Sequence, residues 1–333
     1  MNANTNDITL SLYPLKFRTL HKEKIWGGNR LKQLYHISDN EGRVGESWLL
    51  SGLDGEQTLV ANGFLADNSI DELVEVYMGE LVGDKVYEQF GDKFPLLFKL
   101  IDAADDLSIQ VHPDDNYASE HGLESGKTEM WYVLQSDNSE IIYGLNSPAT
   151  AQQVREALDD HTLLPMLHRE KVKEGDCVLI SSGTIHSLGK GIMVAEIQQS
   201  CDITYRLYDY GRRDSNGQTR ELHVDQALEV ASLEPVNSAL IDYDTKQNGA
   251  ANICQTPYFT VNTLLFDRPV ARDYATLDSF VVYLCINGQA TLSTSTGVTQ
   301  ISEGELVLLP ASENDVLFTP LSAQCRLLEV YID

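Results

Sequence analysis

Two short stretches of this chain, Leu107–Pro113 and Gly126–Trp131, carry residue types that can hold a metal ion. Side chains alternate between the two faces of a β-strand, so every second residue of each stretch lies on one side. In the first stretch the polar row consists of Ser108, Gln110 and His112. In the second, the row consists of Lys127, Glu129 and Trp131. An imidazole on one strand and a carboxylate on another, each backed by an apolar row, predict a metal site inside a β-barrel.

A third stretch, Gly175–His186, adds a second imidazole after an apolar strand and a Ser-Ser-Gly turn. It resembles the second motif of the cupin family, in which a glycine and a proline precede a glycine and a histidine; Ser181 stands at the proline position. In the first cupin motif, Gln110 stands at the place of the first histidine. The resemblance implies a ligand set of Gln110, His112, Glu129 and His186. These donors suit zinc, and the weakly held amide leaves room for a water or a substrate oxygen.

The remaining histidines and the C-terminal part of the chain do not extend this site. We interpret five histidines without matching spacing as ordinary surface or core residues: His36, His121, His161, His168 and His223. A C-terminal copy of the motif has Ser312 at the glycine position and Asp315 at the histidine position, and no histidine follows His223. This excludes a second imidazole-based metal site. We expect the C-terminal barrel to be structural; binding of a sugar or a regulator is the alternative.

A fourth stretch places polar residues at every even position from Glu196 to Arg206. A strand with one solvated face explains many such patterns. A solvated face, however, does not require an acid, an amide, two hydroxyls, a second acid and an arginine in one row. The pattern therefore favours a functional row, on a strand long enough to need a bend or bulge.

Taken together, these stretches resemble the type I phosphomannose isomerases, also called mannose-6-phosphate isomerases, of the shorter bacterial kind. The matching segments follow the family's order over about the first two thirds of the chain: Trp26–Gly28, Gly45–Trp48, Phe94–Lys99, Gln110–Asp114, Lys127–Trp131, Gly183–His186 and Asp202–Arg206.

The resemblance implies a zinc-dependent aldose-ketose isomerase that interconverts mannose 6-phosphate and fructose 6-phosphate with one zinc per chain. Arg206 matches the family's catalytic arginine, and Lys127 matches a lysine proposed to act in proton transfer. Glu196 and Asp202 match acidic residues that line the same pocket. Ser108 and Lys99 match residues expected near the substrate phosphate.

The chemistry of such a reaction agrees with these residue types. Moving a carbonyl between C1 and C2 removes a proton beside it and gives an enediol intermediate whose negative charge needs a cation or a strong donor. A zinc ion can polarise or orient the substrate oxygens, and Arg206 can hold an oxyanion or the phosphate. Four candidates remain open for the base that moves the proton: Lys127, Glu196, Asp202 and a zinc-bound water.

Composition narrows the class of protein further. The 333 residues carry 50 acids and 24 bases, and a formal charge of −26 argues against nucleic acid and anionic membrane as partners. The polar N-terminus predicts no signal peptide, and no apolar run is long enough to span a membrane. Five widely spaced cysteines suit reduced core thiols. We therefore expect a cytoplasmic enzyme, monomeric or weakly dimeric, that acts on a small phosphorylated sugar.

The site must be positioned by a mainly β fold of two cupin-like jelly-roll barrels with a small helical insertion. Met130–Leu134 followed by Glu174–Ile180, and Phe280–Leu284 followed by Glu303–Pro310, read as two copies of one unit, which indicates two barrels. We expect a catalytic domain over residues 1–250, with helical insertions near 66–92 and 147–170. A C-terminal barrel without metal ligands follows over residues 251–333. A further helix is predicted near His223.

Two other functions fit parts of the pattern. A dioxygenase on the same fold would need an open iron site with a different ligand balance, and it would leave Lys127 and Arg206 without a clear task. A sugar-phosphate sensor without activity would be expected to have lost a ligand or Arg206, and neither is lost. Fold alone does not decide among these functions.

Overall fold

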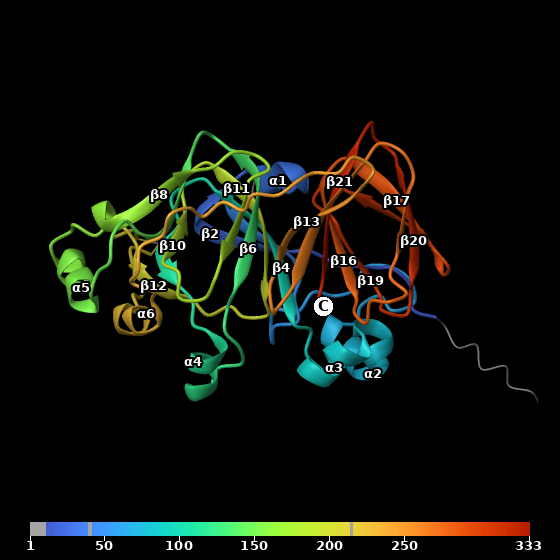
Figure 1. Ribbon diagram of the computed structural model, residues 1–333, viewed down its shortest axis with the longest axis horizontal. Helices are drawn as coiled ribbons and strands as arrows, with labels where there is room; N and C mark the ends of the chain where they lie inside the picture. Colours follow the sequence, from blue (N-terminus) through green and yellow to red (C-terminus); the bar gives the residue numbers. More distant parts are fainter. Residues whose placement is uncertain (1–10, 39–41, 214–215) are drawn as a thin grey trace, which may run out of the picture.

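Two β-barrels lie side by side in the computed structural model, which describes residues 11–38, 42–213 and 216–333. Figure 1 shows the first barrel in blue, green and yellow and the second in orange and red, with most helices placed along the lower edge. Each barrel consists of two antiparallel sheets. The predicted fold class, mainly β with two barrels and a helical insertion, is confirmed. No helix among the described residues has the length and apolar character needed to cross a membrane.

The first barrel is formed by a larger sheet with the order β2-β3-β4-β11-β6-β9 and a smaller sheet with the order β12-β5-β10-β7-β8. The larger sheet comprises β2 Leu20–Gly28, β3 Val44–Leu50, β4 Leu96–Ala103, β11 Ile192–Gln199, β6 Glu129–Ser136 and β9 Cys177–Ile180. The smaller sheet comprises β12 Tyr205–Tyr208, β5 Ile109–Val111, β10 His186–Leu188, β7 Glu140–Leu145 and β8 Leu167–Lys171.

The second barrel repeats this arrangement. Its larger sheet comprises β1 Leu15–Lys16, β19 Leu306–Leu309, β16 Val281–Asn287, β21 Cys325–Tyr331, β14 Thr260–Phe266 and β13 Gly249–Gln255, in that order. Its smaller sheet comprises β15 Val270–Asp273, β20 Asp315–Pro320, β17 Gln289–Thr294 and β18 Gly297–Ser302, in that order. The run β9-β6-β11-β4 corresponds to β19-β16-β21-β14, so the internal repeat seen in the sequence is a repeat of sheet topology. The second barrel also takes β1 from the N-terminal end of the chain, where it pairs with β19.

A shared core holds the barrels together. One cluster of buried apolar side chains contains residues of both halves, and the rings of Phe94 and Phe280 lie 4.8 Å apart within it. The helical insertion contributes to the same contact: Phe280 donates a backbone hydrogen bond to Val82, and Ala311 donates one to Leu81. The two barrels are therefore packed as one body.

The helices confirm most of the sequence expectations and add two. The predicted segments are α2 Ile70–Val82, α3 Asp84–Phe90, α5 Ala151–Asp159 and α6 Val224–Val230. Ser69 caps α2 in a complete capping box with Glu72, as its sequence indicates. Two further helices, α1 Arg30–Leu34 and α4 Asp115–Glu120, were not predicted, and they interrupt the strands of the first barrel. The helical insertion near 147–170 also ends early, since Leu167 begins the strand β8, which pairs with β7.

Two glycine motifs close the first barrel near the site. A Cβ atom on Gly27 would lie 2.6 Å from the backbone nitrogen of Gly45, and one on Gly45 would lie 2.6 Å from the Lys24 side chain. The backbones of β2 and β3 can approach this closely only without side chains. This contact explains why Trp26–Gly28 and Gly45–Trp48 share a glycine-aromatic character, and it fixes the strands that carry Lys24 and Glu46.

Inside the second barrel, the buried carboxylate of Glu329 occupies the position that corresponds to Glu196 in the first barrel. Glu329 is fully buried and accepts hydrogen bonds from Arg272, Tyr274 and Asn262. It faces Asn262 and Tyr283 across the sheet, as Glu196 faces Lys99 and Trp131 in the first barrel. Here the barrel's own side chains satisfy the carboxylate.

Glu329→Ala is therefore expected to lower the free energy of unfolding by about 3–5 kcal/mol, because it leaves the half-buried Arg272 and the buried Asn262 and Tyr274 without their partner. Metal content and the KM of any reaction in the first barrel should stay unchanged if the second barrel is structural. Urea unfolding followed by circular dichroism, with exposed Glu303→Ala as the control, measures the effect. A changed KM in a folded Glu329→Ala protein would instead support ligand binding in the second barrel.

Candidate metal and active site

Three buried side chains from three strands meet inside the first barrel. Glu129 begins β6, His186 begins β10 and His112 directly follows β5. The two carboxylate oxygens of Glu129 lie 3.5 Å from His112 Nε2 and 3.4 Å from His186 Nε2. All three residues are buried, and one donor atom from each lies within 4.8 Å of the others. Within the described part of the chain, they form the one group of three or more His, Cys, Asp or Glu side chains with this spacing.

Backbone hydrogen bonds orient both imidazole rings. His112 Nδ1 lies 2.8 Å from the carbonyl oxygen of Ile203, and His186 Nδ1 lies 2.8 Å from that of Thr184. A carbonyl accepts, so each Nδ1 carries the proton and each Nε2 presents a lone pair toward Glu129. Such outer hydrogen bonds fix the tautomer of metal-binding histidines.

The charge state of the triad fits a bound cation. Burial lowers the pKa of His112 well below its ordinary value and lowers that of His186 to about 4, so both rings are neutral at neutral pH. His112 Nε2 and both oxygens of Glu129 are buried without a hydrogen-bond partner. Lone pairs directed at one another in the absence of protons are costly unless a positive ion lies among them. The donor set of imidazole and carboxylate is the kind that zinc takes.

Gln110 and Lys127 connect the triad to the cavity above it. Gln110 pairs with His186 across β5 and β10, and its Nε2 lies 3.3 Å from His186 Nε2. Ser108 donates to the amide oxygen of Gln110 at 3.3 Å. Lys127 precedes β6 rather than lying within it, and its Nζ lies 3.2 Å from Glu129 Oε2. Gln110 therefore lies beside the triad, with its amide nitrogen toward His186 and its amide oxygen toward Ser108.

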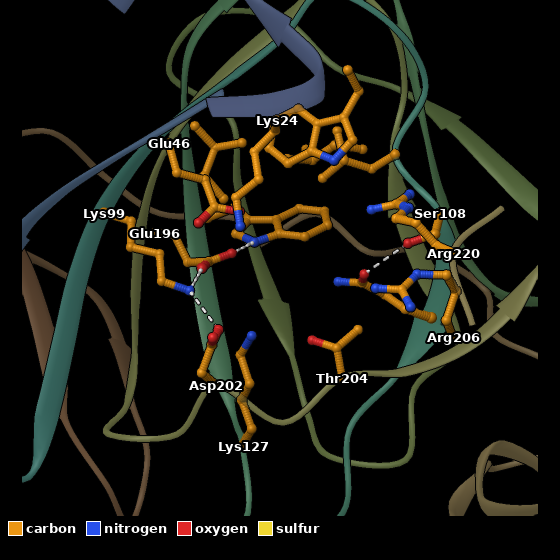
Figure 2. Close-up of a pocket in the computed structure, with 16 residues that line it drawn as sticks. Lys24, Glu46, Lys99, Ser108, Lys127, Glu196, Asp202, Thr204, Arg206 and Arg220 are labelled. Carbon is orange, nitrogen blue, oxygen red and sulfur yellow. Dashed lines mark hydrogen bonds and ion pairs between the residues drawn. The ribbon is translucent and has the colours of Figure 1, made fainter. Parts of the chain in front are cut away.

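A polar cavity of about 230 Å³ opens over these residues. Figure 2 shows Lys99, Glu196, Glu46 and Lys24 on one side of it and Ser108, Arg206 and Arg220 on the other. Trp26, Trp131 and Leu107 add apolar surface to the wall. Every predicted catalytic or substrate-binding residue lines this cavity: Lys99, Ser108, Lys127, Glu196, Asp202 and Arg206.

On the side of the cavity that carries the carboxylates, lysine side chains balance the negative charges. Lys99 Nζ donates to Gln198 at 2.8 Å and lies 3.3 Å from Glu196 Oε1 and 3.9 Å from Asp202 Oδ1. Trp131 Nε1 donates to the second oxygen of Glu196 at 2.8 Å. Burial, followed by repulsion from Glu129, raises the pKa of Glu196 despite Lys99 and Lys127. Burial disfavours the charged form of Lys127, but Glu129, Glu196 and Asp202 outweigh it and raise its pKa.

The opposite side carries arginines with fewer acidic partners. Arg206 lies opposite Gln110 across β12 and β5, and its Nη1 donates to the backbone oxygen of Glu221 at 2.8 Å. Its Nε atom is buried and has no hydrogen-bond partner. Burial and the neighbouring Arg220 lower the pKa of Arg206. Arg206 is therefore a cation with unused hydrogen-bonding capacity beside the cavity.

The functional row at 196–206 is divided between two sheets. β11 ends at Gln199 and β12 begins at Tyr205, so the predicted single bent strand is instead two strands joined by a loop. Glu196 and Arg206 consequently reach the cavity from different sheets.

Sequence reasoning missed some of the lining residues. Lys24, Glu46 and Thr204 lie within or beside segments of the family resemblance, where extending the search along the same strand face would have found them. Arg220 lies in no such segment, and only the fold brings it to the cavity.

The two barrels, the buried histidine-carboxylate triad and the charged cavity beside it define a class of protein. They are typical of a protein that binds a small polar molecule next to a metal site. The family model for the catalytic domain of type I phosphomannose isomerases matches residues 14–150. The chain is 35% identical to the mannose-6-phosphate isomerase ManA of Bacillus subtilis, over 89% of this chain and 93% of that protein. It is 34% identical to the mannose-6-phosphate isomerase of Streptococcus mutans, over 89% of this chain and 92% of that protein. The chain belongs to the family of type I phosphomannose isomerases.

Solved structures agree with this assignment. The mannose 6-phosphate isomerase from Bacillus subtilis superimposes with a TM-score of 0.83 at 34% identity, covering 96% of this chain and 99% of that one. A variant of phosphomannose isomerase from Salmonella typhimurium superimposes with a TM-score of 0.77 at 16% identity, covering 96% of this chain and all of that one. At that identity the second likeness shows the fold alone.

Proposed function

We propose that this isomerase interconverts mannose 6-phosphate and fructose 6-phosphate through an enediol intermediate, with one zinc ion per chain. The observation that carries the proposal is the triad of His112, Glu129 and His186, in which His112 Nε2 and both Glu129 oxygens are buried without a hydrogen-bond partner, next to a cavity lined by acids and arginines. Relatives at 34–35% identity bear the name of this activity.

The proposed ligands are Gln110, His112, Glu129 and His186. Zinc bound there would act as a Lewis acid toward the oxygens on C1 and C2 of the sugar. Gln110, which reaches the triad from the cavity side, would be the most readily displaced ligand because a neutral amide is a weak donor for zinc.

Proton transfer between C1 and C2 requires a base beside the reacting carbons. Lys127 lies 3.2 Å from Glu129, which places it next to the proposed metal position. Its raised pKa keeps it protonated, which suits stabilising the negative charge of an enediolate oxygen. The raised pKa of Glu196 lies closer to neutral pH than that of an ordinary glutamate. A group that accepts a proton and later returns it in one catalytic cycle needs such a pKa. Asp202 is the third candidate from this chain.

Substrate binding is proposed for Ser108, Lys99, Glu196 and Asp202, and catalysis for Arg206 and Lys127. The alternative functions, a dioxygenase or a sensor, would leave the buried lysine-carboxylate cluster and the unpartnered Nε donor of Arg206 without a task. We propose that residues 1–250 form the catalytic domain and that residues 251–333 form a barrel without metal ligands. A cytoplasmic location and a monomer or weak dimer remain predictions.

Chelation should remove the activity reversibly. Purified protein is expected to contain about one zinc per chain and to convert mannose 6-phosphate to fructose 6-phosphate. Treatment with a chelator should abolish turnover and lower the midpoint of thermal unfolding, because an ion bound only to the folded state stabilises it. Metal analysis, a coupled isomerase assay and calorimetry on one sample test this. A zinc-loaded protein without turnover would refute the proposed enzyme.

A further inference from the structure

The lysine proposed to act in catalysis lies outside the strand that follows it. The hydrogen-bonded ladder of β6 begins at Glu129, whereas Lys127 precedes it. Strand pairing therefore fixes Glu129 but not Lys127. Residues 126–128 are nonetheless buried, so a backbone N–H group without a partner in this segment would be costly. The position of Lys127 therefore depends on contacts that other segments supply.

Two side chains hold the backbone on either side of Lys127. Gly126 donates its N–H group to Asp115 Oδ1 at 2.8 Å. Thr128 donates its N–H group to the amide oxygen of Gln199 at 2.8 Å, and the N–H group of Gln199 donates to the carbonyl oxygen of Thr128 at 3.1 Å. The amide nitrogen of Gln199 also donates to Asp115 Oδ1, at 3.0 Å. Asp115 and Gln199 therefore form one connected clamp around residues 126–128.

The clamped segment packs closely against the start of α4 and the metal-binding triad. Lys127 donates its own N–H group to the carbonyl oxygen of Pro113 at 2.9 Å, and Pro113 directly follows a histidine of the triad. A Cβ atom on Gly126 would lie 2.5 Å from the backbone carbon of Asp114, so this approach requires a glycine. With all three N–H groups held, Lys127 Nζ lies 3.2 Å from Glu129 Oε2.

The clamp also contacts the second barrel. Tyr258, which precedes β14, is in hydrogen-bonding contact with Asp115, and burial followed by this contact raises the pKa of Tyr258 to about 12. The described residues that line the charged cavity all belong to the first barrel. The contact between Tyr258 and Asp115 therefore links the second barrel to the segment of Lys127 without passing through the cavity.

We propose that Asp115 and Gln199 are positioning residues that direct Lys127 at the proposed metal position. They do so by holding the backbone of residues 126–128, and Tyr258 links them to the second barrel. This inference rests on the proposed function, because it assigns a task to the surroundings of Lys127. The second barrel then supports the position of this lysine although it supplies no described residue to the cavity.

Substitutions of Asp115 test the proposal, because the residue is exposed and its replacement should leave the protein folded. Asp115→Ala is expected to lower kcat for mannose 6-phosphate about 10- to 100-fold, since a small displacement of a catalytic group is costly, with KM within about threefold. Its zinc content should not change. Asp115→Asn keeps an oxygen that can accept both hydrogen bonds, so its kcat should stay within about threefold of the wild type. Gln199→Met removes the acceptor of Thr128 and should lower kcat as Asp115→Ala does. Tyr258→Phe should cause a smaller fall.

Asp114→Ala is the matched control on the same helix. The side chain of Asp114 caps α4 by accepting from the N–H group of Tyr117 rather than from residues 126–128. This variant should lower the midpoint of thermal unfolding but keep kcat within about threefold. An equal fall in kcat in Asp114→Ala and Asp115→Ala would overturn the proposal, because the effect would then come from α4 as a whole.

Three further results are decisive. A fall in kcat as large in Asp115→Asn as in Asp115→Ala contradicts positioning by the two hydrogen bonds. Loss of zinc from Asp115→Ala would place the effect on Glu129 instead of Lys127 and would also overturn the proposal. An active wild-type enzyme whose Asp115→Ala variant keeps its kcat refutes this inference alone, whereas a wild-type protein without isomerase activity refutes the proposed function.

Discussion

His112→Ala is expected to lose both bound zinc and isomerase activity, with turnover reduced about a thousandfold or more. The ring contributes one of two imidazole nitrogens to the triad, and its Nδ1 is anchored to Ile203. Removing it leaves the buried carboxylate of Glu129 with only His186 and Lys127 as its neighbours among the charged and imidazole groups described above. A Lewis acid at such a site is worth several kcal/mol of transition-state stabilisation, and each 1.4 kcal/mol is a factor of ten.

The measurement combines metal content by atomic emission with kcat in a coupled assay, each before and after incubation with excess zinc. His121→Ala is the matched control, because His121 is an exposed imidazole at the end of α4 that stacks on Tyr117. That variant should keep its zinc and its turnover. If His112→Ala retained one zinc per chain with wild-type turnover, the triad would not be the metal site.

His112 and Glu129 were accessible from strand alternation, whereas the resemblance to the cupin motifs added Gln110 and His186 to the ligand set. Strand alternation places Gln110 and His112 on one face, and the glycine turn before His186 marks a strand end. Strand alternation predicted Lys127 within a strand and residues 196–206 on one strand. In the structure Lys127 precedes β6, and a loop divides residues 196–206 between two strands. In that loop Cys201 donates a backbone hydrogen bond to Gln199, a local turn that alternation of polarity does not reveal.

The missed features depend on contacts between distant segments. Helices α1 and α4 have only five and six residues, too few for a helical period to appear in the sequence. Arg220 reaches the cavity because Asp209, eleven positions earlier, holds it there. The same limit applies to β1, which pairs with β19 at the opposite end of the chain. The family resemblance supplied the order of the motifs, whereas the fold supplied the opposite placement of Lys99 and the arginines.

Arg206→Ala should reduce kcat/KM about 100- to 1000-fold while zinc stays bound. Arg206 takes no part in the hydrogen bonds and ion pairs that hold the side chains of His112, Glu129 and His186, so the triad keeps its geometry. Its guanidinium lies across the strands from Gln110 and has an unused buried Nε donor. A fixed donor of this kind stabilises the charge that develops on the enediolate, and losing one such donor typically costs this much.

The division of the loss between kcat and KM shows at which stage Arg206 acts. A residue that acts on the transition state lowers kcat, whereas one that only holds the phosphate raises KM. Arg206→Ala should therefore show the larger fall in kcat, and Arg206→Lys should recover part of it because the positive charge remains. Arg213, whose side chain is exposed and donates to the backbone of Gly217, provides the control variant Arg213→Ala. Full activity of a zinc-loaded Arg206→Ala enzyme would exclude a catalytic role for this arginine and leave Lys127 as the remaining cation next to the proposed metal position.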